Sequence, residues 1–439
     1  MGFDRRSTSD GRNLMTGTRS VGKPFDIPKV LIWDAYQRVK ANKGAAGVDG
    51  QSLTEFEQDE KDNLYRLWNR MSSGSYFPPP VRAVDIPKHG GGVRTLGVPT
   101  VADRIAQTAV AMVLNPEVEQ VFHEDSYGYR PGRSAWDAVE ACKQRCWRHP
   151  WVIDLDIQGF FDNVPHAPIV AAVDKHTDLP WVLLYVKRWL TAPIRQPDGT
   201  LVGREKGTPQ GSAISPVLSN LFMHYAFDAW LDREFASVRF ERYCDDAVVH
   251  CASERQAEFV RDAIGRRLRQ FGLNLHPDKT RIVYCKQEGR DQDYPVTEFT
   301  FLGFTFRRRP ARLRDGRLKV GFLPAVSKQA KKSMARTIRN WQLGRWTALS
   351  FQEIAAMINP VVAGWINYYG RFYKSELIRF LEQRINPFLV KWAMRKYKRF
   401  RRAKGRARRK LAEIASVYPG MLAHWKHGAL PTGSTAGAV

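Results

Sequence analysis

Carboxylates interrupt two apolar segments of this chain, and this feature constrains its fold more than any other. The segment WVIDLDIQGFFDNV (151–164) is typical of an apolar strand, and it carries Asp156. The segment FERYCDDAVVHC (240–251) is typical of a hairpin, and it carries Asp245 and Asp246 between apolar runs. Burying carboxylates costs free energy unless positive charge compensates them. Taken alone, an Asp-Asp pair is typical of a surface turn, so other features of the chain are needed to distinguish a turn from a metal site.

Two such strands side by side would bring three carboxylates into one small volume. All-oxygen ligands suit Mg²⁺, and two such ions about 3.5–4 Å apart serve nucleotidyl transfer. The chain also carries a formal net charge of +25, with 69 Lys and Arg against 44 Asp and Glu. A balance this basic predicts a nucleic-acid partner, and a generic cationic surface is the alternative.

The length of 439 residues and a hydrophobic content of 43% predict a globular protein of two or three domains. Residues 1–24 are typical of a disordered leader. Strands then alternate with helices, and after residue 306 the pattern becomes helical and basic. Thirteen Lys or Arg and one acid lie between Arg307 and Gln352, and twelve of the twenty residues from Lys391 to Lys410 are basic. Aromatic residues interleave with the second run, which favours a packed helix that presents charge to phosphates.

Five cysteines are scattered along the chain, and the Cys142/Cys146 pair has no second pair to complete a zinc set. We therefore expect buried free thiols in a reducing compartment. The N-terminal residues lack the apolar core of a signal peptide, and no apolar run is long enough to span a bilayer. The sequence predicts a cytoplasmic protein with no membrane partner.

An ordered set of motifs resembles the reverse transcriptases of the group II intron class, in which a polymerase is joined to a maturase. The set covers nearly the whole chain and includes IPKHGGGVRTLGVPTVADR, SYGYRPGRSAWDAV, DLDIQGFFDNV, GTPQGSAISPVLSNLFMHYAFD, RYCDDAVV, LNLHPDKT, FTFLGFTF and INPVVAGWINYYGRF. The resemblance implies an α+β right-hand polymerase with fingers and palm over 25–306. It further implies a helical thumb/maturase domain over 307–390 and a basic nucleic-acid-binding segment over 391–439, without an endonuclease domain.

The resemblance also implies roles for the acidic residues. Asp156, Asp245 and Asp246 correspond to the catalytic triad that binds two Mg²⁺ ions, for which Mn²⁺ is an alternative, and the carbonyl of Ile157 is a further ligand. We expect Asp154 on the opposite face of the strand and leave it out of the triad.

The resemblance assigns further residues to the deoxynucleoside triphosphate (dNTP). Phe161 corresponds to the steric gate that rejects a 2′-hydroxyl, with Phe160 as its core neighbour; packing of both rings in the core is the alternative. Lys279 approaches the triphosphate and acts as general acid, or else pairs with Asp278 on the surface. The remaining positions implied to contact the dNTP are Lys88, Arg94, Gln210 and Gly211, with a core ion pair as the alternative for Arg94.

The predicted function is RNA-directed DNA polymerisation combined with maturase assistance to splicing and mobility of a group II intron. The predicted partners are intron RNA, an RNA template with a DNA primer, dNTPs and a DNA target. Cys244 departs from the family, whose intron-encoded members usually carry Ala between the Tyr and the first Asp. That departure is the support for one alternative, a free-standing enzyme of DNA repair or phage defence. A second alternative is a non-catalytic RNA-binding splicing cofactor.

Overall fold

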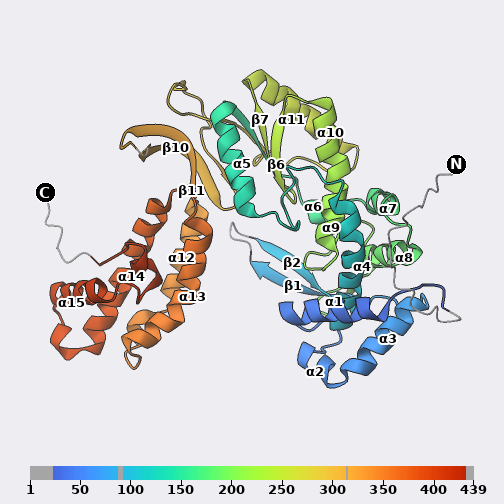
Figure 1. The fold of residues 1–439 in the computed structure, drawn as a ribbon, viewed down its shortest axis with the longest axis horizontal. Helices are drawn as coiled ribbons and strands as arrows, with labels where there is room; N and C mark the ends of the chain where they lie inside the picture. Colours follow the sequence, from blue (N-terminus) through green and yellow to red (C-terminus); the bar gives the residue numbers. More distant parts are fainter. Residues whose placement is uncertain (1–22, 88–91, 313–314, 432–439) are drawn as a thin grey trace, which may run out of the picture. The chain divides into compact units, whose positions relative to one another are not determined.

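The computed structural model describes residues 23–87, 92–312 and 315–431, and it has the α+β architecture expected from the sequence (Figure 1). The chain divides into two compact units, which are described separately. Unit 1 comprises residues 1–86, 94–121 and 164–221, and unit 2 comprises residues 87–93, 122–163 and 222–439. The predicted leader lies almost entirely outside the described residues, and so does Lys88.

Unit 1 combines a helical layer with a small four-stranded sheet of order β2-β1-β4-β5. Ser52 and Thr100 begin two of its helices by accepting hydrogen bonds from the backbone N–H groups of Glu55 and Asp103, and each such cap contributes about 1 kcal/mol. The segment 53–72 forms two helices that meet at Asp59. The elements are α1 (Lys29–Asn42), α2 (Leu53–Gln58), α3 (Glu60–Ser72), β1 (Val81–Pro87), β2 (Val93–Val98), α4 (Val101–Glu119), α7 (His166–Asp174), α8 (Pro180–Thr191), β4 (Ile194–Arg195), β5 (Leu201–Val202) and α9 (Ser215–Met223).

A four-stranded antiparallel sheet of order β6-β7-β3-β8 forms the centre of unit 2. Helices pack against this sheet, and Figure 1 shows α5 beside β6 and β7. The elements are α5 (Ala135–Arg148), β3 (Trp151–Leu155), α6 (Phe160–Asn163), the π-helix η1 (His224–Asp228), α10 (Ala229–Glu234), β6 (Arg239–Tyr243), β7 (Asp246–Cys251), α11 (Glu254–Arg269) and β8 (Arg281–Tyr284).

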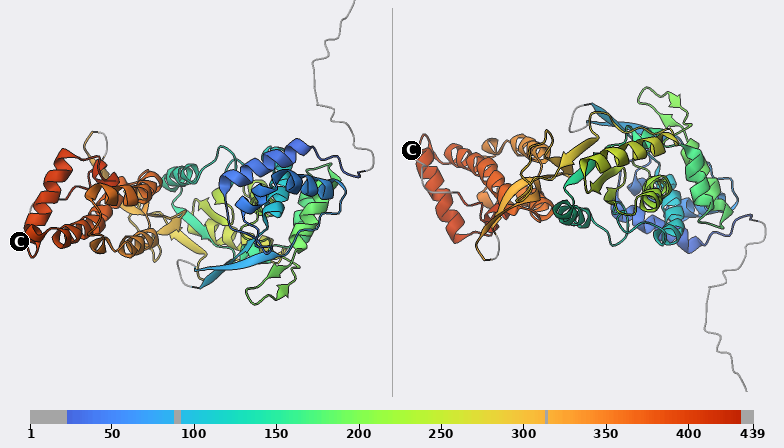
Figure 2. Two further views of the ribbon diagram at one scale, coloured as in Figure 1. Left: turned by 90° about the horizontal axis from the view of Figure 1, so that it is seen from below. Right: turned by 90° about the horizontal axis from the view of Figure 1, so that it is seen from above.

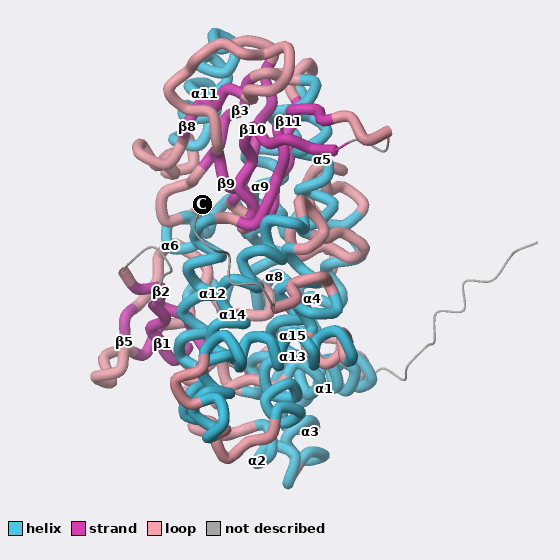
Figure 3. Tube along the Cα trace, turned by 90° about the vertical axis from the view of Figure 1, so that its left-hand side faces the viewer, coloured by secondary structure: helices cyan, strands magenta, loops and turns pink. Residues whose placement is uncertain are grey.

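A second antiparallel sheet follows in the chain, of order β11-β10-β9 (Figure 3). Its strands are β9 (Phe299–Phe301), β10 (Phe304–Arg312) and β11 (Leu318–Val326), and β10 pairs with β11 over nine residues. The expectation that helices begin directly after residue 306 was therefore wrong. The Asp315-Gly316 dipeptide is a hairpin signal, and the alternating apolar residues of 318–326 fit one face of a strand.

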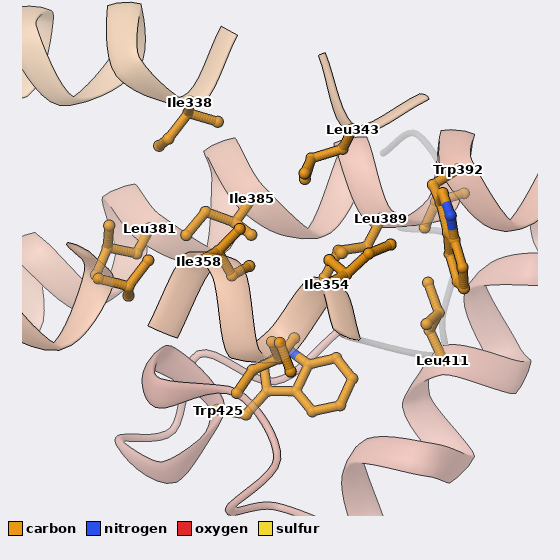
Figure 4. Close-up of a cluster of buried hydrophobic side chains, with 14 of the residues drawn as sticks. Ile338, Leu343, Ile354, Ile358, Leu381, Ile385, Leu389, Trp392, Leu411 and Trp425 are labelled. Atoms are coloured by element: carbon orange, nitrogen blue, oxygen red, sulfur yellow. The ribbon is translucent and has the colours of Figure 1, made fainter. Parts of the chain in front are cut away.

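The C-terminal part of unit 2 is helical, and its helices gather into one bundle in both views of Figure 2. The elements are α12 (Lys328–Asn340), η2 (Leu343–Arg345), α13 (Phe351–Tyr369), α14 (Lys374–Lys396), η3 (Lys398–Phe400), α15 (Lys404–Val417) and α16 (Ala423–Lys426). Their apolar faces form one core around Ile358, Leu389 and Trp425 (Figure 4).

The basic run from Lys391 to Lys410 packs against this core as expected. Trp392 and Phe400 are buried, whereas ten of the twelve Lys and Arg side chains are exposed. Burial of the aromatic positions therefore orders a segment whose cations remain in solvent. Among the described residues, no helix is both long enough and apolar enough to cross a membrane.

Candidate active site

Strand register brings the three predicted carboxylates together at one end of the central sheet of unit 2. Leu155, the last residue of β3, pairs with Ala247 of β7, so Asp156 follows directly beside Asp246. Tyr243 pairs with Asp246 across the β6–β7 hairpin, so its turn consists of Cys244 and Asp245. One strand end and one two-residue turn thus supply three carboxylates.

The electrostatics of this corner agree with that proximity. Burial raises the pKa of Asp246 well above its ordinary value, and the negative charges of Asp154, Asp245 and Asp156 raise it further. Oxygen donors gathered under mutual repulsion form a set that fits divalent cations.

Asp154 belongs to this corner, and the expectation that it lies on the opposite strand face was wrong. Side chains alternate with a period of two, so positions 154 and 156 share a face. The guanidinium Nη2 of Arg281 lies 3.0 Å from Asp154 Oδ2 and compensates its charge. Burial nevertheless raises the pKa of Asp154 to about 6, against the ion pair with Arg281.

The turn that carries Asp245 has an unusual backbone. Cys244 has a φ of 63°, in the left-handed region, at the first position of a two-residue hairpin turn, where glycine is usual. For a residue with a Cβ, this conformation costs about 1–2 kcal/mol. Gly128 packs directly against this turn, because a Cβ built at Gly128 would lie 2.6 Å from the Cys244 nitrogen. Burial raises the pKa of the Cys244 thiol to about 12, and the Asp245 charge adds to the shift.

A buried ion pair anchors the same turn. The Arg242 guanidinium is fully buried and donates to both carboxylate oxygens of Asp228, at 2.7 and 2.6 Å. It also donates to the Cys244 carbonyl at 2.8 Å and to the Ser126 hydroxyl at 2.8 Å. Asp228 ends η1, and π-helical turns of this kind are frequent at functional sites. Sequence reasoning missed Arg242, Asp228 and Gly128, although each lies within or beside a quoted motif.

Lys279 pairs with Asp156 rather than with Asp278, the partner weighed from the sequence. Its Nζ lies 3.1 Å from Asp156 Oδ2. The loop before β8 is fixed to the same aspartate, because the His276 N–H donates to the Asp156 carbonyl at 2.7 Å and the Thr280 hydroxyl donates to it at 3.2 Å.

The residues after Asp156 that were assigned roles are Ile157, Phe160 and Phe161. Ile157 is buried and forms an isolated bridge with Leu275. Phe160 is buried, with its ring 6.0 Å from that of Phe222, whereas Phe161 is half-buried and meets Phe160 edge-on at 5.3 Å. The two adjacent rings thus differ in exposure, so a gate role for Phe161 remains a prediction that this environment permits.

The other residues expected at the dNTP belong to unit 1. Arg94 is exposed on β2 and pairs with no described carboxylate, which excludes the core ion pair within the described chain. The Gln210 carbonyl accepts a hydrogen bond from the Gly97 N–H at 2.8 Å. Gly211 has a φ of 105°, and a Cβ there would lie 3.2 Å from the Gly97 carbonyl oxygen, so the turn requires glycine.

A pocket of about 410 Å³ opens beside Asp246 within unit 2. The β9–β10 turn lines one side with Leu302 and Gly303, and α12 and α13 line the other with residues that include Ser333 and Trp365. The backbone of Leu302 also hydrogen-bonds to Asp246. The pocket therefore joins the carboxylate corner to the helical C-terminal part.

Comparison with known proteins places these features in families. Residues 86–306 match the family "Reverse transcriptase (RNA-dependent DNA polymerase)", and residues 331–411 match "Group II intron, maturase-specific domain". The chain is 31% identical over 322 residues to Protein YkfC of Escherichia coli, a match covering 64% of this chain and 80% of that protein.

Two intron-encoded proteins are also similar. The group II intron-encoded protein LtrA of Lactococcus lactis is 31% identical over 44% of this chain and 32% of its own length. The putative COX1/OXI3 intron 1 protein of Saccharomyces cerevisiae is 23% identical over 81% of this chain and 50% of its own length. The chain thus spans half or less of these two relatives. A solved structure of telomerase from Candida albicans aligns with a TM-score of 0.46 and 11% identity, over 86% of this chain and 68% of that one, a likeness too low to carry an argument.

Proposed function

This chain belongs to the reverse transcriptases and carries a group II intron maturase domain, and we propose that it extends a DNA primer on an RNA template with dNTPs and binds intron RNA as a maturase. As a reverse transcriptase it is an RNA-directed DNA polymerase that depends on divalent metal and acts on nucleic acid. The observation that carries the proposal is the meeting of Asp156, Asp245 and Asp246 through the register of β3, β6 and β7.

The donor set of this corner fits Mg²⁺. Its ligands are carboxylate oxygens, the repulsion among them raises the pKa of Asp246, and a hard divalent cation would relieve that repulsion. Asp156 and Asp245 would hold two ions, with Asp246 and the Ile157 carbonyl as further ligands. The ions would lower the pKa of the primer 3′-hydroxyl and stabilise the leaving pyrophosphate oxygen.

The chain's own residues would orient the reactants around those ligands. Lys279 lies within ion-pair distance of Asp156, and a cation held there would release it toward the triphosphate, where it would neutralise charge and donate a proton. Phe161 would exclude a 2′-hydroxyl by its bulk. Arg94, Gln210 and Gly211 of unit 1 would contact the dNTP as the resemblance implies, and the pocket beside Asp246 within unit 2 would receive the primer end.

The exposed cations from Lys391 to Lys410 support binding of intron RNA, because phosphate contacts by Lys and Arg supply salt-dependent affinity. We propose that both segments defined from the sequence, the thumb/maturase domain over 307–390 and the basic segment over 391–439, contact the RNA. No finding favours either alternative function over this one.

Asp245→Asn tests the proposal. We expect this variant to lose Mg²⁺-dependent primer extension on an RNA template while it keeps RNA affinity, since the change removes one ligand charge and little volume. Asp262→Asn is the matched control, because Asp262 lies exposed on α11 in a surface pair with Arg261, and it should extend primers normally. Primer extension by Asp245→Asn at the wild-type rate would contradict the site, and absence of extension by the wild-type chain would favour the non-catalytic alternative.

A further inference from the structure

Three metal-ligating side chains meet in the core of unit 2, away from the carboxylate corner. Cys142 and Cys146 lie one turn apart on α5, and His250 lies on β7 beneath them. One ligand atom from each lies within 4.8 Å of the others, and all three residues are fully buried. The spacing of the cysteine pair did not point to His250, which lies more than a hundred positions away in the chain.

The surroundings of His250 resemble those of a metal ligand. Its Nε2 lies 2.7 Å from Glu241 Oε2, and Glu241 is in turn held by Arg145 Nη1 at 2.7 Å. Its Nδ1 is buried and makes no hydrogen bond of ordinary geometry with a described residue, while the Cys146 thiol interacts with the ring. A carboxylate that orients one imidazole nitrogen while the other faces cysteine sulfurs is the arrangement found around metal-bound histidines.

A fourth ligand is available. Cys285 follows β8 and is fully buried; burial raises its pKa well above the ordinary value, and a hydrogen bond with the Cys146 thiol raises it further. Cys142, Cys146, His250 and Cys285 would form a Cys₃His set, a known tetrahedral zinc combination. Ligand atoms around zinc are about 3.5–3.8 Å apart for the usual bond lengths. The ligand atoms of Cys142, Cys146 and His250 lie within 4.8 Å of one another, so rotations that shorten these distances by about 1 Å would suffice, and Cys285 would turn toward them as the fourth ligand.

We propose that this cluster binds one Zn²⁺ ion as a structural site that ties α5 to β7 and β8 behind the central sheet. Bound as thiolates, Cys142, Cys146 and Cys285 would give the ion and its ligands a net charge of −1, and the positive charge of Arg290, which acts on Cys285, would offset part of it. The thiols lose their protons to solvent as the metal binds, so affinity rises with pH. Val248 separates His250 from Asp246 on one strand face, about 13 Å apart at 3.3 Å per residue, so this site is distinct from the carboxylate corner.

Metal content of the full-length, tag-free protein tests the proposal. After exposure to Zn²⁺ and gel filtration, mass spectrometry should find about one zinc per chain in the wild type and almost none in Cys146→Ser. Cys251→Ser is the matched control, because Cys251 is buried on β7 directly after His250, lies on the opposite strand face, and has burial as the sole cause of its raised pKa. It should retain the metal.

Co²⁺ binding to the wild type gives a test that does not depend on how the variants fold. A sulfur-to-cobalt charge-transfer band and strong visible bands would show tetrahedral thiolate ligation. Added Zn²⁺ should displace the Co²⁺ and abolish these bands. A weak spectrum without thiolate bands would overturn the proposal. Equal zinc content in wild type and folded Cys146→Ser would overturn it as well.

Discussion

The buried pair of Arg242 and Asp228 allows a sharp test of how the catalytic turn is held. Arg242→Met keeps a side chain of similar length but removes the charge, and with it the bonds to Asp228, the Cys244 carbonyl and the Ser126 hydroxyl. Both charged side chains are fully buried. Removing one member of such a pair leaves an uncompensated charge and lowers the free energy of unfolding by about 3–5 kcal/mol.

The matched control is Arg261→Met on α11. Arg261 and Asp262 also approach to 2.9 Å, but Arg261 is only half-buried and Asp262 is exposed, so this change should cost less than about 1 kcal/mol. Urea unfolding followed by tryptophan fluorescence gives both stabilities. Since the substitution is the same, the difference between the two variants reports the burial of the Arg242 pair together with its bonds to Cys244 and Ser126.

The double variant Arg242→Met with Asp228→Leu separates stability from catalysis. Apolar replacement of both partners is often neutral, so most of the lost stability should return. The Cys244 carbonyl still lacks its donor, and a shift of the turn by about 1 Å costs on the order of a hundredfold in rate. We therefore expect kcat for primer extension to stay low while the KM for dNTP changes little. Wild-type kcat in the double variant, or a loss below 1 kcal/mol in Arg242→Met, would refute this reasoning.

Two further predictions concern other buried positions. Gly128→Ala should lower kcat for primer extension at least about tenfold, because its Cβ would lie 2.6 Å from the Cys244 nitrogen. Gly203→Ala is the control and should keep the wild-type kcat, because the space around its added Cβ is open. Equal kcat values in the two variants would contradict the importance of the Gly128 contact. Burial lowers the pKa of His424 to about 3, so the unfolded chain binds one more proton below its ordinary pKa of 6.5. The contribution of His424 to stability should therefore be fully present above pH 6.5 and fall by about 1.4 kcal/mol per pH unit below it, until about pH 3. Buried carboxyls such as Asp154 contribute with the opposite sign, so the stability difference between wild type and His424→Gln, measured by urea unfolding at each pH, isolates this contribution. Variants of the exposed His427 should leave it unchanged.

The sequence predicted the elements that carry the chemistry. Apolar runs interrupted by Asp156 and by Asp245 and Asp246 indicated strands with acidic ends, and register brought those ends together. The rings of Phe160 and Phe161 differ in exposure in the expected sense. These predictions succeeded because they depend on local pattern and on a short list of pairings.

Other features were beyond local pattern. The ion pair between Arg242 and Asp228 joins a strand to a π-helix, and the hydrophobic periodicity of the sequence does not indicate that both charges are buried. The partners of Cys142 and Cys146 lie on strands distant in the chain, so pair spacing could not reveal them. The position of Asp154 could have been predicted from the sequence. Side chains of a strand alternate with a period of two, so Asp154 and Asp156 lie on the same face.

The turn between Tyr243 and Asp246 shows why the residue at position 244 matters less than its surroundings. A left-handed residue with a Cβ stores strain, and strain persists only where neighbouring structure determines the backbone. Gly128 leaves no room on one side of the turn, and Arg242 holds its carbonyl on the other. These two contacts would impose the same backbone on Ala as on Cys, since both carry a Cβ and differ by one buried sulfur. Cys244 by itself is therefore weak support for a different biological role. The position of Asp245 depends on the contacts that Gly128 and Arg242 make with the turn.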